Sequence, residues 1–290
     1  MKMIIKEEQG SVVIYDITDF KLADILDCGQ CFRFYENDDG NFSGMAGDRF
    51  LKISQSDNKL KFTDVTMEEF NGFFREYFDI DRDYGKIKKY LSYDETLRKA
   101  SAYGSGIRIL KQDSWEALCS FIISQNNNIK RIKKIIKALC EYCGPKISGG
   151  HHAFPSAETI VKLSPEELKD LGFGFRASYI HDAAQKVFSK EIDLELISKM
   201  SIDEARKELM KIKGVGPKVA ECTLLYGMFR LEAFPVDVWI KRAIDVFYGG
   251  EIPQFAAKYA GIAQQYIFHY IRTCPEALED AEHKSSKMVV

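Results

Sequence analysis

The hydrophobic pattern of this chain changes once along its length, from the spacing of strands to the spacing of helices, and that change limits the folds it can adopt. Short runs rich in β-branched and aromatic residues occur at 12–15, 31–35 and 50–53. Clusters of Asp, Asn and Gly separate such runs, as they do in turns. Residues 1–65 are therefore expected to form an antiparallel, meander-like sheet.

From about residue 84 onward, apolar residues recur at helical spacing instead. Sequences of the capping-box type, in which a Thr, Asp or Ser is followed three residues later by Glu, predict helix starts at Thr66, Asp113, Ser164 and Ser201. The pattern as a whole predicts an α+β protein, in which a β-rich N-terminal domain is followed by a larger all-α part.

The net charge of the chain does not indicate a nucleic-acid partner. The 290 residues carry a formal net charge of -2, so any basic surface has to be local. Hydrophobic residues make up 46% of the chain, enough to bury a core. There is no apolar run of about eighteen residues and no signal-peptide pattern at the start. We expect a cytoplasmic protein, nucleoid-associated if bacterial, with no membrane partner.

The cysteines raise the question of a metal. The chain has 7 of them, an odd number, which argues against a disulfide scaffold. Two Cys-x-x-Cys pairs, Cys28/Cys31 and Cys140/Cys143, could form a zinc site, but we favour packing, since Cys31 opens a strand-like run and Cys140 falls near a helical apolar stripe. A clustered set of four cysteines is missing near the C-terminus, so no iron–sulfur cluster is expected.

The most informative segment for function is 209–220. A helix ends there, Gly214-Val215-Gly216 makes a tight turn, and Pro217 stands near the first position of the next helix. The amides that begin that helix point outward, where a phosphate can accept from them. By itself this pattern also fits a plain helix-turn-helix corner.

A second element follows at 234–238. Pro235 favours an extended chain at Phe234, and Asp237 precedes the helical run 238–247, so that it can serve as the N-cap of that helix. A capping role and a catalytic role for this carboxylate are compatible.

Residues 213–237 resemble the hairpin and Gly/Pro…Asp motif of the helix-hairpin-helix DNA glycosylase superfamily, and within it the 8-oxoguanine DNA glycosylases. Four more stretches agree with that branch in the same order, so that the resemblance runs from about residue 10 to about residue 270. The linked motifs are 28–33, 124–129, 171–177, 214–220, 235–238 and 259–264.

The resemblance implies the domain organisation. An antiparallel β-rich, TBP-like domain is expected over 1–112, followed by an all-α glycosylase core of two helical subdomains. One subdomain would comprise 113–133 plus 218–290, and the other 134–217, ending in the hairpin.

The resemblance also implies a bifunctional enzyme, a DNA N-glycosylase with AP lyase activity. Lys218 would attack C1′ of the damaged nucleotide, expel the base and form a Schiff base, after which β-elimination would cut the strand. A protonated amine is a poor nucleophile, so this lysine has to lose its proton first. Asp237 would stabilise the positive charge that develops on the sugar and could help to deprotonate the lysine.

The damaged base has to leave the duplex to be reached. Oxidised guanine carries a proton on N7 that guanine lacks, and the resemblance assigns its recognition to the backbone carbonyl of Gly29. Gln264 would read the Watson–Crick edge, because an amide both donates and accepts. Cys222 and Phe268 would stack on the two faces of the base. Core packing or a plain turn remains the alternative for each of these residues.

A further set matches family positions that contact DNA around the lesion. Asn126, Arg131 and Arg176 would read the orphaned cytosine and hold the gap, with Arg131 inside the basic run 130–134. Phe175 would wedge into the duplex, as apolar side chains do in other DNA-bending proteins. Here too, a solvated charged face and core packing are the alternatives.

The remaining expectations concern partners and departures. The partner is duplex DNA that contains 8-oxoguanine, bound by a monomer without a cofactor. No metal is required for the reaction, although the carbonyls of Met210, Ile212 and Val215 could hold a cation that bridges to a phosphate.

Three residues depart from the pattern of the family. Trp239 stands where many members have His, Phe175 replaces a Tyr that is common in the animal enzymes, and Pro217 replaces a Thr. We therefore expect weaker discrimination for cytosine as the opposite base.

Two alternatives stay open. Another glycosylase of the superfamily, for alkylated or mismatched bases, is disfavoured because the first type generally lacks the hairpin lysine and the second usually carries an iron–sulfur cluster. A non-catalytic DNA-binding module is disfavoured by the joint presence of Lys218, Asp237, Gly29 and Gln264.

Overall fold

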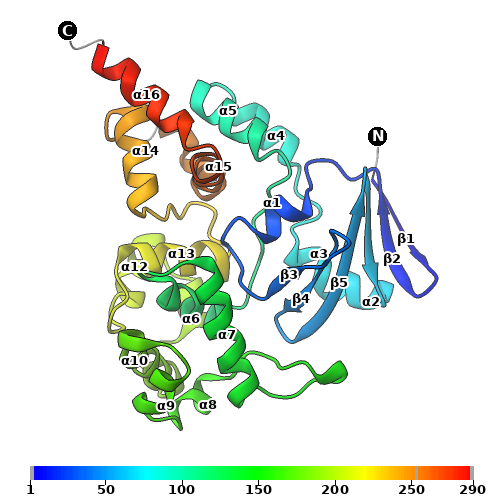
Figure 1. Ribbon diagram of the computed structural model, residues 1–290, viewed down its shortest axis with the longest axis vertical. Coiled ribbons are helices and arrows are strands. Elements are labelled where there is room, and N and C mark those ends of the chain that lie inside the picture. The colour runs from blue at the N-terminus through cyan, green and yellow to red at the C-terminus, as the bar shows by residue number, and fades with distance from the viewer. Residues whose placement is uncertain (1–2, 252–253, 288–290) are drawn as a thin grey trace.

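The computed structural model describes residues 3–251 and 254–287, and it confirms the α+β class. A 6-stranded antiparallel sheet in the order β1-β2-β6-β5-β4-β3 lies beside a larger helical part (Figure 1). The strands are β1 Ile4–Glu8, β2 Ser11–Tyr15, β3 Phe34–Glu36, β4 Phe42–Ala46, β5 Arg49–Ser56 and β6 Lys59–Thr63.

One face of the sheet forms the core of the N-terminal part. The register places Val12 opposite Phe62, Phe62 opposite Ile53, and Ile53 opposite Phe42, which makes a row of buried apolar side chains across four strands. The rings of Phe62 and Phe70 meet edge to face at 5.1 Å, where the helical stretch α2 (Met67–Glu69), η1 (Phe70–Phe74) and α3 (Arg75–Tyr77) covers this face.

The meander prediction is right for β3 to β6, which neighbour one another in chain order, but β2 pairs with β6 rather than with β3. The chain between β2 and β3 does not turn back at once, because α1 (Leu22–Leu26) and the following loop intervene (Figure 1).

The predicted strand at 31–35 is wrong in its first half, since β3 begins only at Phe34. Phe32 packs edge to face on Phe121 of the helical part at 5.8 Å. The Arg33 guanidinium donates to the Glu116 carboxylate at 3.0 Å, again across to the helical part. Both side chains thus contact the helical part instead of a neighbouring strand, and β3 begins only after them.

The helical part begins with a pair of helices that lie beside the C-terminal ones (Figure 1). Tyr84, Leu91 and Leu97 of this pair belong to the same buried cluster as the later helices. The division at 112 and the two helical subdomains stay predictions. The further elements are α4 Tyr84–Leu91, α5 Glu95–Tyr103, α6 Ser114–Ser124, α7 Ile129–Cys143, η2 Ser148–Gly150, α8 Ala157–Val161, α9 Pro165–Asp170, η3 Gly174–Arg176, α10 Ala177–Phe188, α11 Leu194–Ser198, α12 Ile202–Leu209, α13 Pro217–Cys222, η4 Thr223–Gly227, α14 Val238–Tyr248, η5 Gln254–Tyr259, α15 Ala260–Thr273 and α16 Glu276–Lys287.

The predicted helix starts are confirmed, with one difference in detail. Thr66, Ser164 and Ser201 form complete capping boxes. Asp113 accepts from the backbone N–H of Glu116, but the Glu116 side chain does not return the bond, because it pairs with Arg33 instead. The ion pair between Glu116 and Arg33 therefore takes the place of the second hydrogen bond of the capping box.

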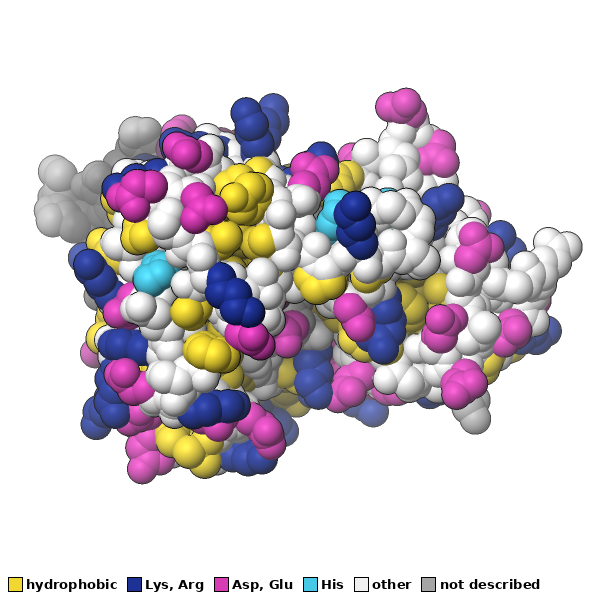
Figure 2. All heavy atoms as spheres, turned by 90° about the horizontal axis from the view of Figure 1, so that it is seen from below, with side chains coloured by type: hydrophobic (Ala, Val, Ile, Leu, Met, Phe, Trp, Pro, Cys, Tyr) yellow, Lys and Arg dark blue, Asp and Glu magenta, His cyan; other side chains and the backbone are white. Residues whose placement is uncertain are grey.

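The surface agrees with the small net charge. On the face shown in Figure 2, Lys and Arg side chains alternate with Asp and Glu, and apolar surface lies between them. Among residues 3–251 and 254–287, no helix is long and apolar enough to cross a membrane. Within the same residues, His, Cys, Asp and Glu do not gather into a group of three that could hold a metal ion.

Candidate active site

The hairpin between α12 and α13 depends on its first glycine. Gly214 has a φ of +77°, and a Cβ at this position would lie 2.3 Å from the ring of Tyr179. Gly216 is different, because its φ is -98° and nothing lies within 4 Å of the place where a Cβ would be. Gly216 is the N-cap of α13 and leaves the first amides of this helix open to an outside partner.

The two glycines should therefore respond differently to alanine. Gly214→Ala is expected to lower the free energy of unfolding by about 2–4 kcal/mol, because the side chain meets both a ring and an unfavourable φ. Gly216→Ala should cost less than about 1 kcal/mol but weaken binding of duplex DNA about tenfold, because the methyl group occupies the approach of a phosphate. Thermal unfolding and fluorescence anisotropy measure the two quantities. Equal stability of the two variants would contradict the geometry of the turn.

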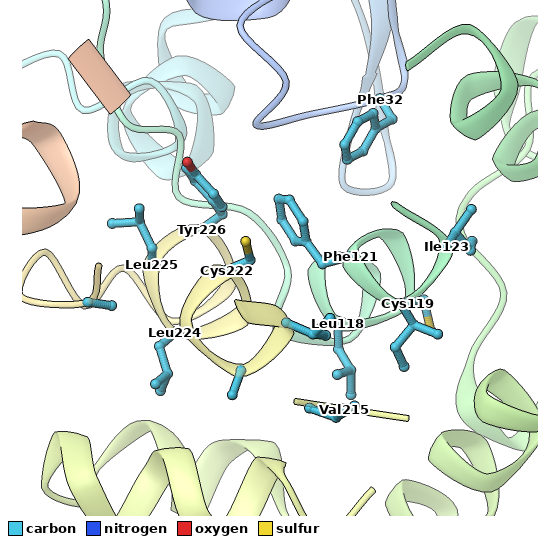
Figure 3. Close-up of a cluster of buried hydrophobic side chains, with 14 of the residues drawn as sticks. Phe32, Leu118, Cys119, Phe121, Ile123, Val215, Cys222, Leu224, Leu225 and Tyr226 are labelled. Carbon is cyan, nitrogen blue, oxygen red and sulfur yellow. The ribbon is translucent and has the colours of Figure 1, made fainter. Parts of the chain in front are cut away.

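The helix that follows the hairpin presents one side to a cavity. Lys218, Cys222 and Tyr226 are spaced four residues apart along α13 and η4, which brings them to a common face. Figure 3 shows Cys222 and Tyr226 pointing to the same side as Phe121 of α6, and the rings of Phe121 and Tyr226 stack at 5.2 Å.

This space, called here the Lys218 cavity, joins segments that are far apart in the chain. Its volume is about 60 Å³. All six residues predicted to hold the sugar or the damaged base line it. The lining residues are Gly29, Phe121, Lys218, Cys222, Tyr226, Pro235, Asp237, Gln264, Gln265 and Phe268.

Lys218 and Asp237 enter the cavity without pairing with each other. The Lys218 ammonium donates to Ser124 Oγ at 2.9 Å and lies 5.3 Å from the centre of the Phe121 ring. The Asp237 side chain accepts from the backbone N–H of Ile240 at 2.8 Å, which confirms it as the N-cap of α14. Among the described residues, Lys218 and Asp237 do not form an ion pair with each other. Both side chains line the cavity and can contact a substrate there.

Gln264 has an unused acceptor. Its side chain is only 4% exposed, and its Oε1 has no hydrogen-bond partner. A buried amide oxygen without a partner costs free energy, so it calls for a donor from elsewhere. Because the residue lines the Lys218 cavity, a bound molecule with an N–H group would supply that donor.

Cys222 offers a neutral surface. Burial raises the pKa of its thiol to about 11, although the Lys218 ammonium opposes this shift and the Asp237 carboxylate adds to it. The thiol therefore stays protonated near neutral pH and is suited to packing against a flat apolar face rather than to nucleophilic attack. Phe268, half-buried on α15, is the second such surface in the cavity.

Gly29 is held in a conformation that favours glycine, with a φ of +85°. A Cβ there would lie 3.7 Å from Phe268, an ordinary contact, so the backbone rather than the space requires glycine. The neighbouring Gln30 is fully buried and its amide binds backbone groups of Ile25, Arg108 and Leu110. The loop that carries Gly29 is thus fixed against the linker before α6.

The residues predicted to contact the opposite strand lie outside the cavity. Asn126 and Arg131 are exposed, and Phe175 is 53% exposed and stacks under the guanidinium of Arg176 at 4.4 Å. Arg176 itself is only 2% exposed and donates to the carbonyls of Gln125 and Asn126, so in this structure it holds the loop that presents Asn126. An exposed Phe is suited to insertion between bases.

The predicted cation site at the hairpin has one carbonyl already engaged. Ile212 O accepts from the N–H of Val215 at 3.0 Å. That the carbonyls of Met210, Ile212 and Val215 hold a cation between the hairpin and a phosphate stays a prediction.

The sequence did not point to several residues of the cavity. Tyr226, Gln265 and Phe121 line it. Pro235, which also lines it, and Ser124, which accepts from the lysine, lie within matched motifs but had no role assigned in the cavity. In the sequence, Gln265 and Tyr226 are ordinary helix residues. Only their positions relative to Gln264 and Lys218 could have suggested that they face the same cavity.

Comparisons with known proteins cover both parts of the chain. The family described as 8-oxoguanine DNA glycosylase, N-terminal domain, matches residues 12–118, and the HhH-GPD superfamily base excision DNA repair protein family matches residues 119–254. The N-glycosylase/DNA lyase of Saccharomyces cerevisiae is 31% identical over 251 residues, which span 76% of this chain and 66% of the yeast protein.

Two solved structures are similar over nearly the whole length. MBOgg1, in complex with a low affinity DNA ligand, shares 42% identity at a TM-score of 0.88, with 94% of this chain and 99% of that chain covered. The 8-oxoguanine glycosylase/lyase of Clostridium acetobutylicum, in complex with dsDNA containing cytosine opposite to 8-oxoG, shares 38% identity at a TM-score of 0.87, with 93% and 98% covered.

Proposed function

Because this chain belongs to the 8-oxoguanine DNA glycosylase family within the HhH-GPD superfamily, we propose that it excises 8-oxoguanine from duplex DNA and then cleaves the strand. The observation that carries the proposal is the Lys218 cavity. An amine and a carboxylate line it together, next to a buried amide oxygen that has no partner.

In the proposed first step, the deprotonated amine of Lys218 attacks C1′ of the extruded nucleotide. The bond between C1′ and N9 breaks, and the base leaves with the bonding electrons and takes up a proton. Asp237 faces the sugar and stabilises the positive charge that grows on it. Because the Asp237 carboxylate is fixed by the backbone of α14, little reorganisation is needed when that charge develops.

In the second step, the sugar ring opens and the lysine nitrogen forms a Schiff base with C1′. Loss of a proton from C2′ then breaks the bond from C3′ to the 3′ phosphate oxygen, which cuts the strand. The chain itself supplies nucleophile and carboxylate, so the proposed chemistry has no step that calls for a metal or an iron–sulfur cluster.

Base recognition in this proposal uses both ends of the chain. The Gly29 carbonyl accepts from the N7–H of 8-oxoguanine, and Gln264 accepts from the Watson–Crick edge. Cys222 and Phe268 pack on the two faces.

A panel of duplexes tests the proposal against its alternatives. Purified protein is incubated with duplexes that contain 8-oxoguanine opposite cytosine, 3-methyladenine opposite thymine, or adenine opposite 8-oxoguanine. Released bases are identified by mass spectrometry and strand cuts by denaturing gel. We expect free 8-oxoguanine and a cut strand from the first duplex. Release of only 3-methyladenine or adenine, or binding without release, would overturn the proposal in favour of the other glycosylases or of a binding module.

Opposite-base preference is expected to be modest. Phe175 differs from the Tyr common in the animal enzymes, Trp239 differs from the His of many family members, and both side chains are exposed. We predict that single-turnover excision of 8-oxoguanine opposite cytosine exceeds excision opposite adenine by less than about 100-fold, which corresponds to less than about 2.7 kcal/mol. A ratio of several orders of magnitude would contradict this prediction.

A further inference from the structure

We propose that Gln265 and Tyr226 form a buried positioning pair that sets the orientation of the Gly29 peptide, and through it the recognition of the oxidised base. This inference rests on the proposed function, because it concerns the group that would accept from the N7–H of 8-oxoguanine. In this inference neither Gln265 nor Tyr226 contacts the reacting sugar atoms, and both act through Gly29.

The hydrogen bonds of Gln265 define the pair. Its side chain is only 1% exposed. Gln265 Nε2 donates to the carbonyl oxygen of Cys28 at 3.2 Å, and Gln265 Oε1 accepts from the hydroxyl of Tyr226. The chain of bonds therefore runs from η4 through α15 to the loop before β3.

The contact falls on the peptide that joins Cys28 to Gly29. A peptide is planar, so a bond that fixes the Cys28 carbonyl also fixes the N–H of Gly29 and the plane from which Gly29 continues. The conformation of Gly29, with a φ of +85°, is one that a glycine can easily leave. Loss of the bond to the Cys28 carbonyl would therefore let the Gly29 carbonyl turn more easily.

The other side of Gly29 is anchored independently. The buried amide of Gln30 donates to the carbonyls of Ile25 and Arg108 and accepts from the N–H of Leu110. Gly29 is therefore held between two anchors, Gln30 on the linker before α6 and Gln265 on α15. The second anchor lies on α15, which also carries Gln264 and Phe268, and Arg272 of the same helix donates to the carbonyl of Asp27 in this loop.

The contrast between the adjacent glutamines separates positioning from binding. Gln264 keeps an unpartnered Oε1 and can accept from a bound base, whereas both ends of the Gln265 amide are already occupied. The Gln265 amide is therefore oriented from both of its ends, whereas the Gln264 oxygen is not. Figure 3 shows Tyr226 beside Phe121, and these rings stack at 5.2 Å, so the Tyr226 ring is itself held in place.

The consequence concerns selectivity. Guanine and 8-oxoguanine differ at N7 by a single hydrogen, and a misdirected carbonyl cannot detect it. Removal of the pair should lower excision of 8-oxoguanine much more than it lowers cleavage at an abasic site. An abasic site uses Lys218 and Asp237 but presents no base to Gly29.

The test uses the full chain with two variants. Gln265→Leu removes both bonds, and Tyr226→Phe removes only the hydroxyl while keeping the stacked ring. Each is compared with the wild type by kcat/KM on an 8-oxoguanine:C duplex and on an abasic-site:C duplex. Tyr266→Phe is the matched control, because this neighbouring residue of α15 is equally buried and its hydroxyl has no hydrogen-bond partner.

We expect Gln265→Leu to lower 8-oxoguanine excision by about 10- to 100-fold, and Tyr226→Phe by about 3- to 10-fold. In each variant the loss of abasic-site cleavage should be clearly smaller than the loss of excision. The double variant should resemble Gln265→Leu alone, because the two residues act in one chain of bonds. Tyr266→Phe should change neither activity.

Equal losses on both substrates would overturn the inference, because they would indicate a general structural defect. Excision of 8-oxoguanine at the wild-type rate in both variants would overturn it as well. A wild-type protein that does not release 8-oxoguanine at all but cuts abasic sites would instead reject the proposed function, so the two failures are distinguishable.

Discussion

Replacing Lys218 with glutamine is expected to lower release of 8-oxoguanine and strand cleavage by about 10³-fold or more. A neutral amide cannot attack C1′ or form a Schiff base, although it is nearly as long as the lysine side chain. The fold should change little, because Lys218 is half-buried and makes one side-chain hydrogen bond, to Ser124. Single-turnover excision and thermal unfolding measure the two effects.

An exposed lysine near the hairpin gives the matched control. Lys207 lies on the surface of α12 and does not line the Lys218 cavity. Lys207→Gln removes the same charge and should keep activity within a few-fold of wild type. If both variants lost activity alike, the defect would lie in the overall charge of this surface rather than in the nucleophile.

Replacing Asp237 with asparagine is expected to lower excision by about 10²–10³-fold without unfolding the protein. Asparagine caps helices as well as aspartate does, so the bond to Ile240 N and the start of α14 should survive. Only the negative charge beside the sugar is lost. The melting temperature should therefore remain close to that of the wild type while the rate falls.

A second substitution separates the two roles of this residue. Asp237→Ala removes cap and charge together and should cost an additional ~1 kcal/mol of stability. If Asp237→Asn retained most of the wild-type rate, the carboxylate would be only a cap. If it lost as much stability as the alanine variant, the capping geometry of α14 would be wrong.

The hairpin, the N-cap at Asp237 and the four helix starts with a capping sequence could be predicted from the sequence, because each depends on residues close together in the chain. Gly214 needs a positive φ, and Asp237 needs only the amide three residues ahead. Local rules decide such features. The expected strand at 31–35 was half wrong because Phe32 and Arg33 turn to partners in the helical part.

The Lys218 cavity could be predicted only in part. The resemblance named Gly29, Gln264 and four other residues, and these do line one cavity. Residues that act through hydrogen bonds across the fold leave no local pattern. Gln265 meets Cys28 over a separation of 237 positions, so only the folded chain reveals the contact.

Covalent trapping tests the central claim most directly. The protein is mixed with an 8-oxoguanine:C duplex and sodium borohydride, which reduces a Schiff base to a stable bond between protein and DNA. The adduct is then digested, and the modified residue is identified by mass spectrometry. We predict an adduct on Lys218 that is absent from Lys218→Gln. No adduct with the wild type, or an adduct on another residue that persists in Lys218→Gln, would contradict the assignment of Lys218 as the nucleophile.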